Sequence, residues 1–332
     1  MKVSELGEFG LINLLAEITG ASQCTVRQKL LIGIGDDAAV WHNRSTVQLA
    51  TVDSLIEGVH FKLDTTGWRE LGWKALAVSL SDIAAMGGVP QYALVSLALP
   101  GETMVEDVAD LYRGIAELAD RFGVAIAGGD SSNAPLVVIN TTVFGETAGR
   151  NEDILTRSAA IAGDKIAVSG YLGGATGGLA MLSNNMDLNK KDSAALRQAF
   201  LRPQPRLNEG QMLLQQGVKA AIDISDGLIA DLGHICQASG VGARIEVEHV
   251  PLHPALKASF GNKALDMALA GGEDYELLFT ATEEVIKKAA KKTACPLTLI
   301  GEITNNTGKI ELIDASGKPY KPAASGWQHF KQ

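Results

Sequence analysis

The chain has 332 residues, 46% of them hydrophobic and 20% charged, so it is long enough to bury the cores of two domains. Its formal net charge is −9 and it has no cluster of Lys and Arg, which argues against nucleic acid as a partner. The N-terminus carries acids where a secretory signal carries bases, and no apolar run is long enough for a membrane span, so we expect no membrane association.

Short apolar segments separated by glycines predict a mixed α and β fold. In the first half the periodicity predicts, in chain order, a strand at 46–55, a helix at 69–86, a strand at 90–99, a helix at 105–121, and strands at 123–130 and 136–146. After these, a polar stretch precedes a new cycle of strand, glycine-rich turn and helix. We therefore place a boundary near 148–160 and divide the chain into domains 1–148 and 149–332.

The second half contains a glycine-rich turn, SGYLGGATGGLAML, at 169–182. Its backbone N–H groups could bind phosphate, or its glycines could allow close packing against the other domain, and the sequence leaves both interpretations open. Further on, AAIDISDGLIADLGHICQASG at 220–240 predicts a short strand followed by a helix. Ser225 or Asp226 is expected to cap that helix, which puts Asp226 at a strand-to-helix turn.

Two adjacent carboxylates, Asp36 and Asp37, stand in the glycine-containing stretch GIGDD. A loop that cradles phosphate would avoid two negative charges, whereas a divalent cation would accept them. Other acids also lie in glycine-rich or apolar segments, where an uncompensated charge is costly. The full set is Asp36, Asp37, Asp53, Asp82, Asp130, Asp223, Asp226 and Glu273.

For any one of these acids, helix capping or an ion pair with Arg113 or Arg157 is the simpler interpretation. For the whole set, binding of Mg²⁺ is favoured, because Mg²⁺ takes a few carboxylates and completes its coordination with water and phosphate. Zinc is disfavoured, since the cysteines and histidines show no paired ligand spacing. The Walker, protein-kinase and dinucleotide-binding motifs and the EF-hand loop are all missing from the sequence.

Three cysteines, Cys24, Cys236 and Cys295, are odd in number and widely spaced. This usage fits a reducing compartment without a disulfide framework, so we expect a cytoplasmic protein.

An ordered series of motifs closely resembles the thiamine-monophosphate kinase family, within the aminoimidazole-ribonucleotide-synthetase-like superfamily of ATP-dependent enzymes. The motifs are GIGDDAAV, TVDSLIEGVHF, KALAVSLSDIAAMGG, AGGDSS, LTRSAA, AIDISDGLIADLGH and AGGEDYELLF. The resemblance implies a two-domain α/β fold with an N-terminal mixed-sheet dimerisation domain and a C-terminal α/β domain that completes the active site. It also implies a homodimer in which N-terminal strands pair, with ATP between the domains.

The implied reaction transfers the ATP γ-phosphoryl group to thiamine monophosphate, giving thiamine diphosphate and ADP, the last step of thiamine diphosphate biosynthesis. Several Mg²⁺ ions are implied as cofactors, with ATP as co-substrate. A phosphate monoester with a second pKa of about 6 is largely ionised at neutral pH, so we expect no catalytic base among the side chains.

The resemblance also implies roles for individual residues. Its metal ligands fall on Asp37, Thr51, Val52, Asp53, Asp82, Asp130, Asp223 and Asp226, with Val52 contributing its carbonyl and Asp36 left as a turn or capping residue. Its nucleotide contacts fall on Gly129, Asp130, Arg157 and Ser225, and its contacts to thiamine monophosphate on His60, Glu273 and Trp327. The bare sequence instead favours His60 as a half-buried histidine at a strand end and Trp327 as a core residue.

Two other functions stay open. One is a different reaction of the same superfamily, on an amide or on selenide, although Cys24 lacks the glycine-rich context that selenide chemistry needs. The other is a metal-dependent nucleotide-binding protein that has lost turnover.

Overall fold

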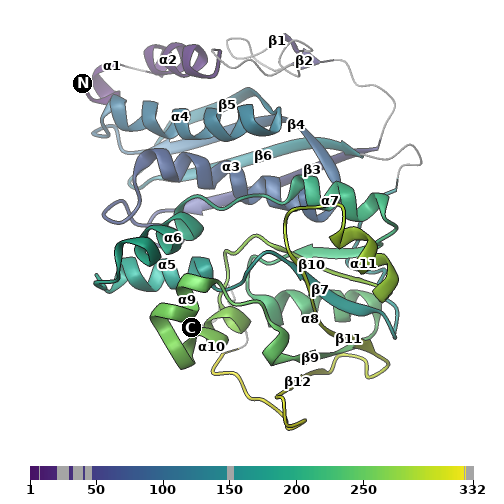
Figure 1. Cartoon of the computed structure of the whole chain (residues 1–332). Coiled ribbons are helices and arrows are strands. Elements are labelled where there is room, and N and C mark those ends of the chain that lie inside the picture. The colour runs from purple at the N-terminus through teal and green to yellow at the C-terminus, as the bar shows by residue number, and fades with distance from the viewer. Residues whose placement is uncertain are drawn as a thin grey trace. The chain divides into compact units, whose positions relative to one another are not determined.

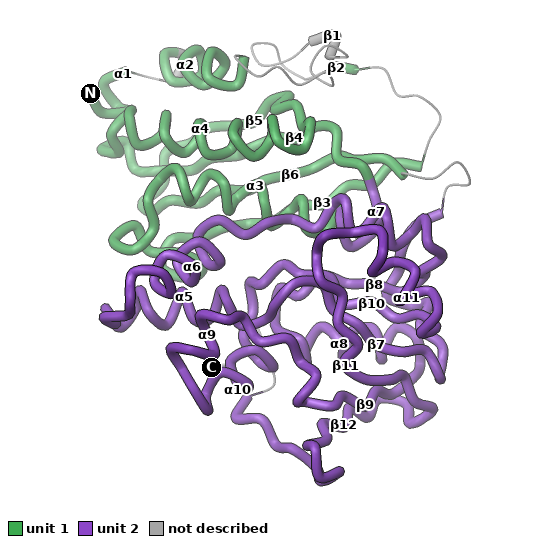
Figure 2. The backbone as a smooth tube through the Cα atoms, in the orientation of Figure 1, with its two compact units in different colours: residues 1–83, 89–147 green, residues 84–88, 148–332 purple. Residues whose placement is uncertain are grey.

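The computed structural model describes residues 1–6, 8–20, 30–32, 40–41, 47–147, 153–324 and 326. The chain forms two compact units, residues 1–83 with 89–147 (unit 1) and residues 84–88 with 148–332 (unit 2) (Figure 2). Each unit contains a sheet with both parallel and antiparallel neighbours, accompanied by helices (Figure 1). The two-domain α/β fold expected from the sequence is confirmed.

The described residues of the first half form four helices and six strands. They are α1 (Val3–Leu6), α2 (Glu8–Gly20), β1 (Leu30–Ile32), β2 (Val40–Trp41), β3 (Gln48–Ile56), α3 (Trp68–Ala85), β4 (Gly88–Leu99), α4 (Val105–Phe122), β5 (Ala125–Asn133) and β6 (Val138–Thr147). The predicted strands and helices of this half correspond to β3, α3, β4, α4, β5 and β6 within a few residues, and Gly87 follows the end of α3 with a left-handed φ of 68°.

The main sheet of unit 1 has four strands in the order β3-β6-β4-β5. Strands β3 and β6 pair antiparallel, whereas β4 and β5 are parallel and are joined by α4. Helices α3 and α4 lie over one face of this sheet (Figure 1). Along β6 buried and half-buried residues alternate, because successive side chains point to opposite faces and only one face is covered by helices.

Helices α3 and α4 approach each other closely at two glycines. A Cβ atom at Gly72 would lie 1.8 Å from the carbonyl oxygen of Leu111, and one at Gly114 would lie 2.0 Å from that of Arg69. Only glycine has no Cβ, so each helix can place its backbone directly against the other. This contact holds α3, and with it Asp82, in a defined position.

The second half contains the remaining elements. The helices are α5 (Gly174–Ser183), α6 (Lys190–Leu201), α7 (Leu207–Gln215), α8 (Leu228–Ser239), α9 (Pro254–Phe260), α10 (Ala264–Ala270) and α11 (Glu283–Ala290), with short 3-10 helices at Val247–His249 and Gly261–Lys263. The strands are β7 (Lys165–Ser169), β8 (Ala220–Asp223), β9 (Gly242–Glu246), β10 (Leu277–Ala281), β11 (Leu297–Thr304) and β12 (Ile310–Ile313). The strand and helix predicted at 220–240 are β8 and α8.

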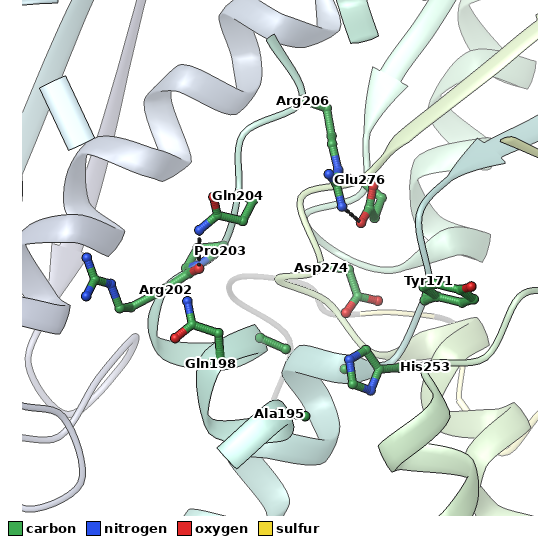
Figure 3. Close-up of a pocket in the computed structure, with 12 residues that line it drawn as sticks. Tyr171, Ala195, Gln198, Arg202, Pro203, Gln204, Arg206, His253, Asp274 and Glu276 are labelled. Atoms are coloured by element: carbon green, nitrogen blue, oxygen red, sulfur yellow. Dashed lines mark hydrogen bonds and ion pairs between the residues drawn. The ribbon is translucent and has the colours of Figure 1, made fainter. Parts of the chain in front are cut away.

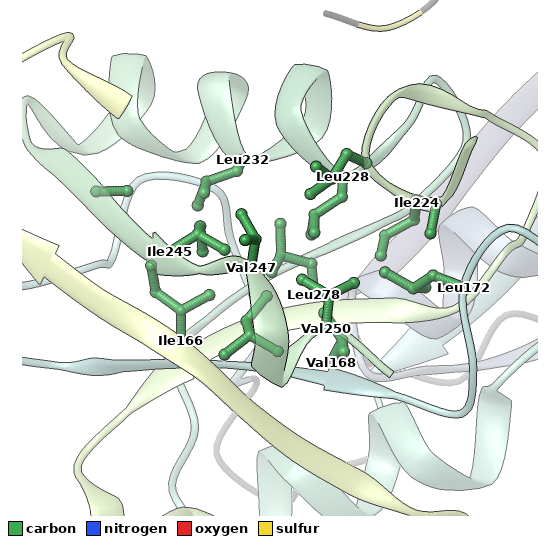
Figure 4. Close-up of a cluster of buried hydrophobic side chains, with 14 of the residues drawn as sticks. Ile166, Val168, Leu172, Ile224, Leu228, Leu232, Ile245, Val247, Val250 and Leu278 are labelled. Atoms are coloured by element: carbon green, nitrogen blue, oxygen red, sulfur yellow. The ribbon is translucent and has the colours of Figure 1, made fainter. Parts of the chain in front are cut away.

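The six strands of unit 2 form a sheet in the order β12-β9-β11-β7-β10-β8. Only the pair of β12 and β9 is parallel among the pairings of this sheet. Every residue of the edge strand β8 and of its neighbour β10 is buried. Figure 4 shows Leu228 and Leu232 of α8 near Ile166, Val168 and Leu278 of the sheet, in one cluster of buried side chains.

In the described part of the chain, no helix combines the length and the apolar character needed to cross a membrane.

Candidate functional site

Unit 1 brings together Thr51, Asp53 and Asp82, three of the predicted metal ligands. Thr51 Oγ1 donates a hydrogen bond to Asp82 Oδ2, and Asp53 Oδ2 accepts one from Ser79 Oγ at 2.9 Å. Thr51 and Asp53 share one face of β3 because they are two residues apart, and Ser79 and Asp82 share one face of α3 because they are three apart. The periodicities of strand and helix therefore direct these four polar side chains toward one another, between β3 and α3.

The carboxyl groups of Asp53 and Asp82 are themselves in hydrogen-bond contact. Burial raises the pKa of Asp53 to about 6, and the neighbouring charge of Asp82 adds to this effect. Two carboxylates and a hydroxyl in contact form a set of hard oxygen donors whose mutual repulsion a divalent cation would relieve. The residues of this cluster therefore fit Mg²⁺.

Val52 lies between Thr51 and Asp53 on β3, with 62% of its surface exposed. Its side chain points to the opposite face of the strand from theirs. Val52 has no polar side-chain atom, so the metal contact predicted for it requires its backbone carbonyl.

Gly129 and Asp130 lie on β5, at the opposite edge of the sheet from β3. A Cβ atom at Gly129 would lie 1.9 Å from the carbonyl oxygen of Val95 on the neighbouring strand, so packing alone requires glycine there. Asp130 is exposed, and Ser132 Oγ lies 3.4 Å from its Oδ2. The sheet order separates Asp130 from the cluster of Asp53 and Asp82 by the width of the sheet.

His60 lies in the turn that follows β3 and is half-buried. Its Nδ1 accepts a hydrogen bond from the backbone N–H of Ile56 at 3.0 Å. When the ring is neutral, its proton therefore resides on Nε2. His60 is therefore a half-buried histidine at a strand end, as the bare sequence suggested. Its predicted contact with thiamine monophosphate stays a prediction.

In unit 2, the loop between β8 and α8 carries Asp223, Ser225 and Asp226. Asp223 ends β8 and is only 3% exposed. The prediction that Ser225 or Asp226 caps α8 is wrong, because the helix begins after Gly227 and no side chain caps it there. Instead Asp231, in the first turn of α8, reaches back and accepts hydrogen bonds from the backbone of this loop.

Asp231 and His234 lie beside the predicted metal ligand Asp226, and the sequence reasoning did not single them out. Ligand atoms of Asp226, Asp231 and His234 all lie within 4.8 Å of one another. Burial, with a further contribution from the charge of Asp226, raises the pKa of Asp231 to about 7, even though three backbone N–H groups favour its charged form. The spacing of Asp231 and His234, three residues apart on one helix face, is the signal that could have indicated them.

The GGEDYE segment packs against the same loop. The N–H of Glu273 donates to Ser225 O at 2.8 Å, and a Cβ atom at Gly272 would lie 2.3 Å from that oxygen. Glu273 has a positive φ of 67°, which is uncommon for a residue other than glycine. Glu273 and Asp226, predicted to contact substrate and metal, are therefore held in neighbouring backbone segments.

The glycine-rich turn at 169–182 contacts Asp274 of the GGEDYE segment. The carboxylate of Asp274 accepts hydrogen bonds from Gly173 N at 2.5 Å and Ala175 N at 3.1 Å, at the start of α5. A side-chain anion thus occupies the N–H groups that could have bound phosphate. The glycines of this turn pack against other residues of unit 2, with a Cβ atom at Gly178 placed 2.3 Å from Leu196 O, and close packing against the other domain stays a prediction.

A cavity of about 220 Å³ lies beside this turn (Figure 3). Its lining includes Tyr171, His253, Asp274 and the ion pair of Arg206 and Glu276. The opposite charges of that pair neutralise each other. Sequence reasoning did not indicate this cavity, because its walls come from distant segments of the chain.

Arg157 is exposed and follows Thr156, which bridges to Ala220 at the start of β8. Asp223 is the last residue of that strand and Asp226 follows it, so Arg157 is near the start of β8 and the two acids are at its other end. Arg113 forms ion pairs with Glu106 and Asp110 of its own helix. Asp36, Asp37 and Trp327 lie outside the described residues.

Comparison with known proteins gives consistent matches for both units. Residues 35–147 match the family described as AIR synthase related protein, N-terminal domain, and residues 162–313 match the corresponding C-terminal domain. The chain is 36% identical to the thiamine-monophosphate kinase of Aquifex aeolicus, over 99% of this chain and 100% of that protein. It is 37% identical to the Escherichia coli K12 thiamine-monophosphate kinase, over 98% of each chain.

Solved structures agree with these matches. The crystal structure of the thiamine-monophosphate kinase of Stenotrophomonas maltophilia K279a aligns with a TM-score of 0.82 and 37% identity, over 95% of this chain and 98% of that one. The structure of AaThiL complexed with AMPPCP and TMP aligns with a TM-score of 0.77 and 35% identity, over 99% of each chain.

Proposed function

Because this chain belongs to the thiamine-monophosphate kinase family, we propose that its clustered acids serve Mg²⁺-dependent transfer of the ATP γ-phosphoryl group to thiamine monophosphate. The products are thiamine diphosphate and ADP. The contact between the carboxyl groups of Asp53 and Asp82 is the observation that supports these two residues as metal ligands in this reaction.

The acceptor needs no general base from the protein. Its phosphate monoester is largely ionised at neutral pH, since the second pKa of such a group is about 6. The obstacle is repulsion between anions, which for two unit charges about 4 Å apart reaches about 4 kcal/mol at an effective dielectric constant of 20. The task of the site is therefore to neutralise and align phosphates.

Bound Mg²⁺ would neutralise phosphate charge and align the reacting groups. In unit 1, Thr51, Asp53 and Asp82, with the backbone of Val52, would hold metal. In unit 2, Asp223 and Asp226 offer carboxylates at the end of β8. Asp130 and the predicted ligand Asp37 complete the proposed set.

We assign nucleotide contacts to Gly129, Asp130, Arg157 and Ser225. The exposed position of Arg157 leaves its guanidinium available to phosphate, and the half-buried Ser225 belongs to the same loop as Asp226.

For thiamine monophosphate the proposed contacts are His60, Glu273 and Trp327. The thiazolium ring of this substrate is a permanent cation, which a carboxylate and an indole face both attract. Glu273 is held by its backbone hydrogen bond to Ser225, so its carboxylate is presented from a constrained segment.

A homodimer is part of the proposal. On the sheet face of unit 1 opposite α3, Val52 is 62% exposed, and Ala50 and Phe144 are paired neighbours on β3 and β6. Phe144 already packs against Trp41, but the exposed side chain of Val52 on the same face is apolar surface of the kind that a second copy would bury. We also propose a cytoplasmic location, since Cys236 and Cys295 are free thiols.

The test is a panel of acceptors with the purified protein, in which ADP release and thiamine diphosphate formation are both measured. We expect stoichiometric formation of the two products with thiamine monophosphate and Mg²⁺, and none with thiamine or after chelation by EDTA. Equal ADP release without any acceptor would indicate an ATPase instead. Binding of Mg²⁺ and ATP without product from any acceptor would indicate a nucleotide-binding protein that has lost turnover.

A further inference from the structure

One carboxylate oxygen of Asp231 collects three consecutive backbone N–H groups. Asp231 Oδ2 accepts from Ser225 N at 3.1 Å, from Asp226 N at 3.1 Å and from Gly227 N at 3.0 Å. Successive N–H groups that converge in this way form a concave anion site, and here the anion is supplied by the protein itself. The carboxylate of Asp231 therefore determines the backbone path of the loop.

The other side of the loop is also held. Ser225 O accepts from Glu273 N at 2.8 Å, and Ile224 O accepts from Tyr275 N at 2.9 Å. A Cβ atom at Gly227 would lie 2.8 Å from Ala270 O, so the loop lies directly against the GGEDYE region. Two carbonyl groups of this stretch are therefore bound by one segment and three N–H groups by Asp231, so the loop is anchored on both sides.

Asp231 differs from Asp226 in its surroundings. Asp231 is 2% exposed and its Oδ2 is occupied by three donors, whereas Asp226 is half-buried. No predicted role falls on Asp231, yet its carboxylate lies close to that of Asp226. This arrangement is that of a residue that orients a metal ligand through the backbone.

We propose that Asp231 is a positioning residue, which fixes the backbone of Ser225–Gly227 and thereby the direction in which Asp226 offers its carboxylate to a divalent cation. The inference rests on the proposed function, in which Asp226 is a metal ligand. In this proposal Asp226 coordinates the cation directly, whereas Asp231 acts only by holding the loop.

The experiment compares Asp231→Ala and Asp231→Asn with wild type. Hydrogen exchange of the amides of Ser225–Gly227 reports the loop, and calorimetric titration of Mg²⁺ in the presence of ADP reports metal-dependent binding without turnover. Asp231→Ala should speed exchange at these three amides and raise the Mg²⁺ concentration for half-maximal binding by about tenfold or more. Asp231→Asn keeps one oxygen acceptor, so both effects should be intermediate.

A matched control is Asp192→Ala. Asp192 is also an acid in the first turn of a helix of unit 2, but its carboxylate accepts from the side chain of Asn189, the N-cap residue of the same helix. This variant should leave both the exchange at Ser225–Gly227 and the Mg²⁺ titration unchanged.

Two results would overturn the proposal. If Asp231→Ala speeds exchange while the Mg²⁺ titration stays at the wild-type value, Asp231 is only structural. If Asn and Ala weaken Mg²⁺ binding equally while exchange is unchanged, Asp231 is itself a ligand. Should Asp231→Ala fail to fold, Asp231→Asn carries the test, and an unaltered titration in that variant refutes the proposal. The titration omits thiamine monophosphate, so failure of the acceptor panel and failure of this inference are distinguishable.

Discussion

Arg206 and Glu276, 70 residues apart in the chain, form a two-point ion pair in unit 2. The distance is 2.6 Å from Arg206 Nε to Glu276 Oε2 and 2.5 Å from Nη2 to Oε1. Ser169 Oγ also donates a hydrogen bond to Glu276 Oε2 at 2.5 Å. The same hydroxyl oxygen accepts a hydrogen bond from the N–H of Leu277 at 2.8 Å. Because Glu276 is 5% exposed, its charge depends on these donors.

Replacement of Arg206 by Ala should therefore be strongly destabilising. The substitution leaves a buried carboxylate without its cation, which typically costs about 3–5 kcal/mol of unfolding free energy. Urea denaturation of the variant and wild type measures the difference. The control is Arg113→Ala, whose partners Glu106 and Asp110 are exposed, and for which a loss below about 1 kcal/mol is expected. Equal losses in the two variants would contradict this account of the pair.

Substitution of Asp53 by Asn should separate metal binding from stability. Removing one of two touching carboxyl groups relieves repulsion, so without divalent cation the melting temperature should not fall. The increase in melting temperature on adding Mg²⁺ and ATP should be lost, and kcat should drop by about 100-fold, equivalent to about 2.7 kcal/mol. Asp64→Asn, at an exposed acid of the same unit, is the control. A variant with wild-type Mg²⁺ dependence would remove Asp53 from the metal site.

Gly129 and Asp130 are neighbours, but substitution of Gly129 should reduce stability, whereas substitution of Asp130 should reduce activity. A methyl group at Gly129 would meet the backbone of Val95, which cannot move without disturbing the strand, so Gly129→Ala should destabilise by about 1–3 kcal/mol. Asp130→Asn, at an exposed side chain, should change the unfolding free energy by less than about 0.5 kcal/mol while abolishing turnover. Thermal melts and kcat of the two variants check this, and a normal melt for Gly129→Ala would disprove the packing requirement.

The carboxyl group of Asp274 should make stability fall as pH rises. Burial raises its pKa from 3.8 to about 7, with Glu276 and Glu273 as neighbouring charges. The folded state then holds the proton more tightly than the unfolded state, so this contribution is greatest below about pH 4 and is lost as pH rises to about 7. The slope should stay below about 1.4 kcal/mol per pH unit, because one carboxyl group binds at most one proton more in the folded state than in the unfolded state.

Asp274→Asn, which does not titrate, isolates this effect. Unfolding free energies from urea melts at pH 5, 6, 7 and 8 should show the wild type losing its advantage over the variant as pH increases. Parallel pH profiles of the two proteins would mean that Asp274 titrates near its ordinary pKa.

The elements of unit 1 from β3 to β6 were predictable because each carries its own local signal, whereas α1, α2, β1 and β2 were not predicted. Strand β6 alternates along its whole length, and α3 is followed by the Gly87-Gly88 pair. The meeting of Thr51, Asp53 and Asp82 was expected only through family resemblance, since nothing local relates a strand residue to a helix residue about thirty positions later.

Asp231 shows what local patterns cannot provide. An acid in the first turn of a helix usually faces solvent and interacts with the helix dipole, so Asp231 in LIADLGH suggested that ordinary role, and only its spacing from His234 pointed to another. Its inward orientation depends on Gly227, whose φ of 116° turns the preceding loop over the helix. The pairing of Arg206 with Glu276 likewise arises only when the sheet of unit 2 brings distant segments together.

The close crossing of α3 and α4 at Gly72 and Gly114 has a consequence for mutational scanning. A library selected for activity should lose every replacement at these two positions, with a depletion as severe as that at Asp53, although neither glycine bears a polar side chain. A survey that ranks residues by intolerance alone would place both glycines in the active site. Parallel selection for folded protein, such as resistance to proteolysis, should recover Asp53 variants but not those at Gly72 or Gly114.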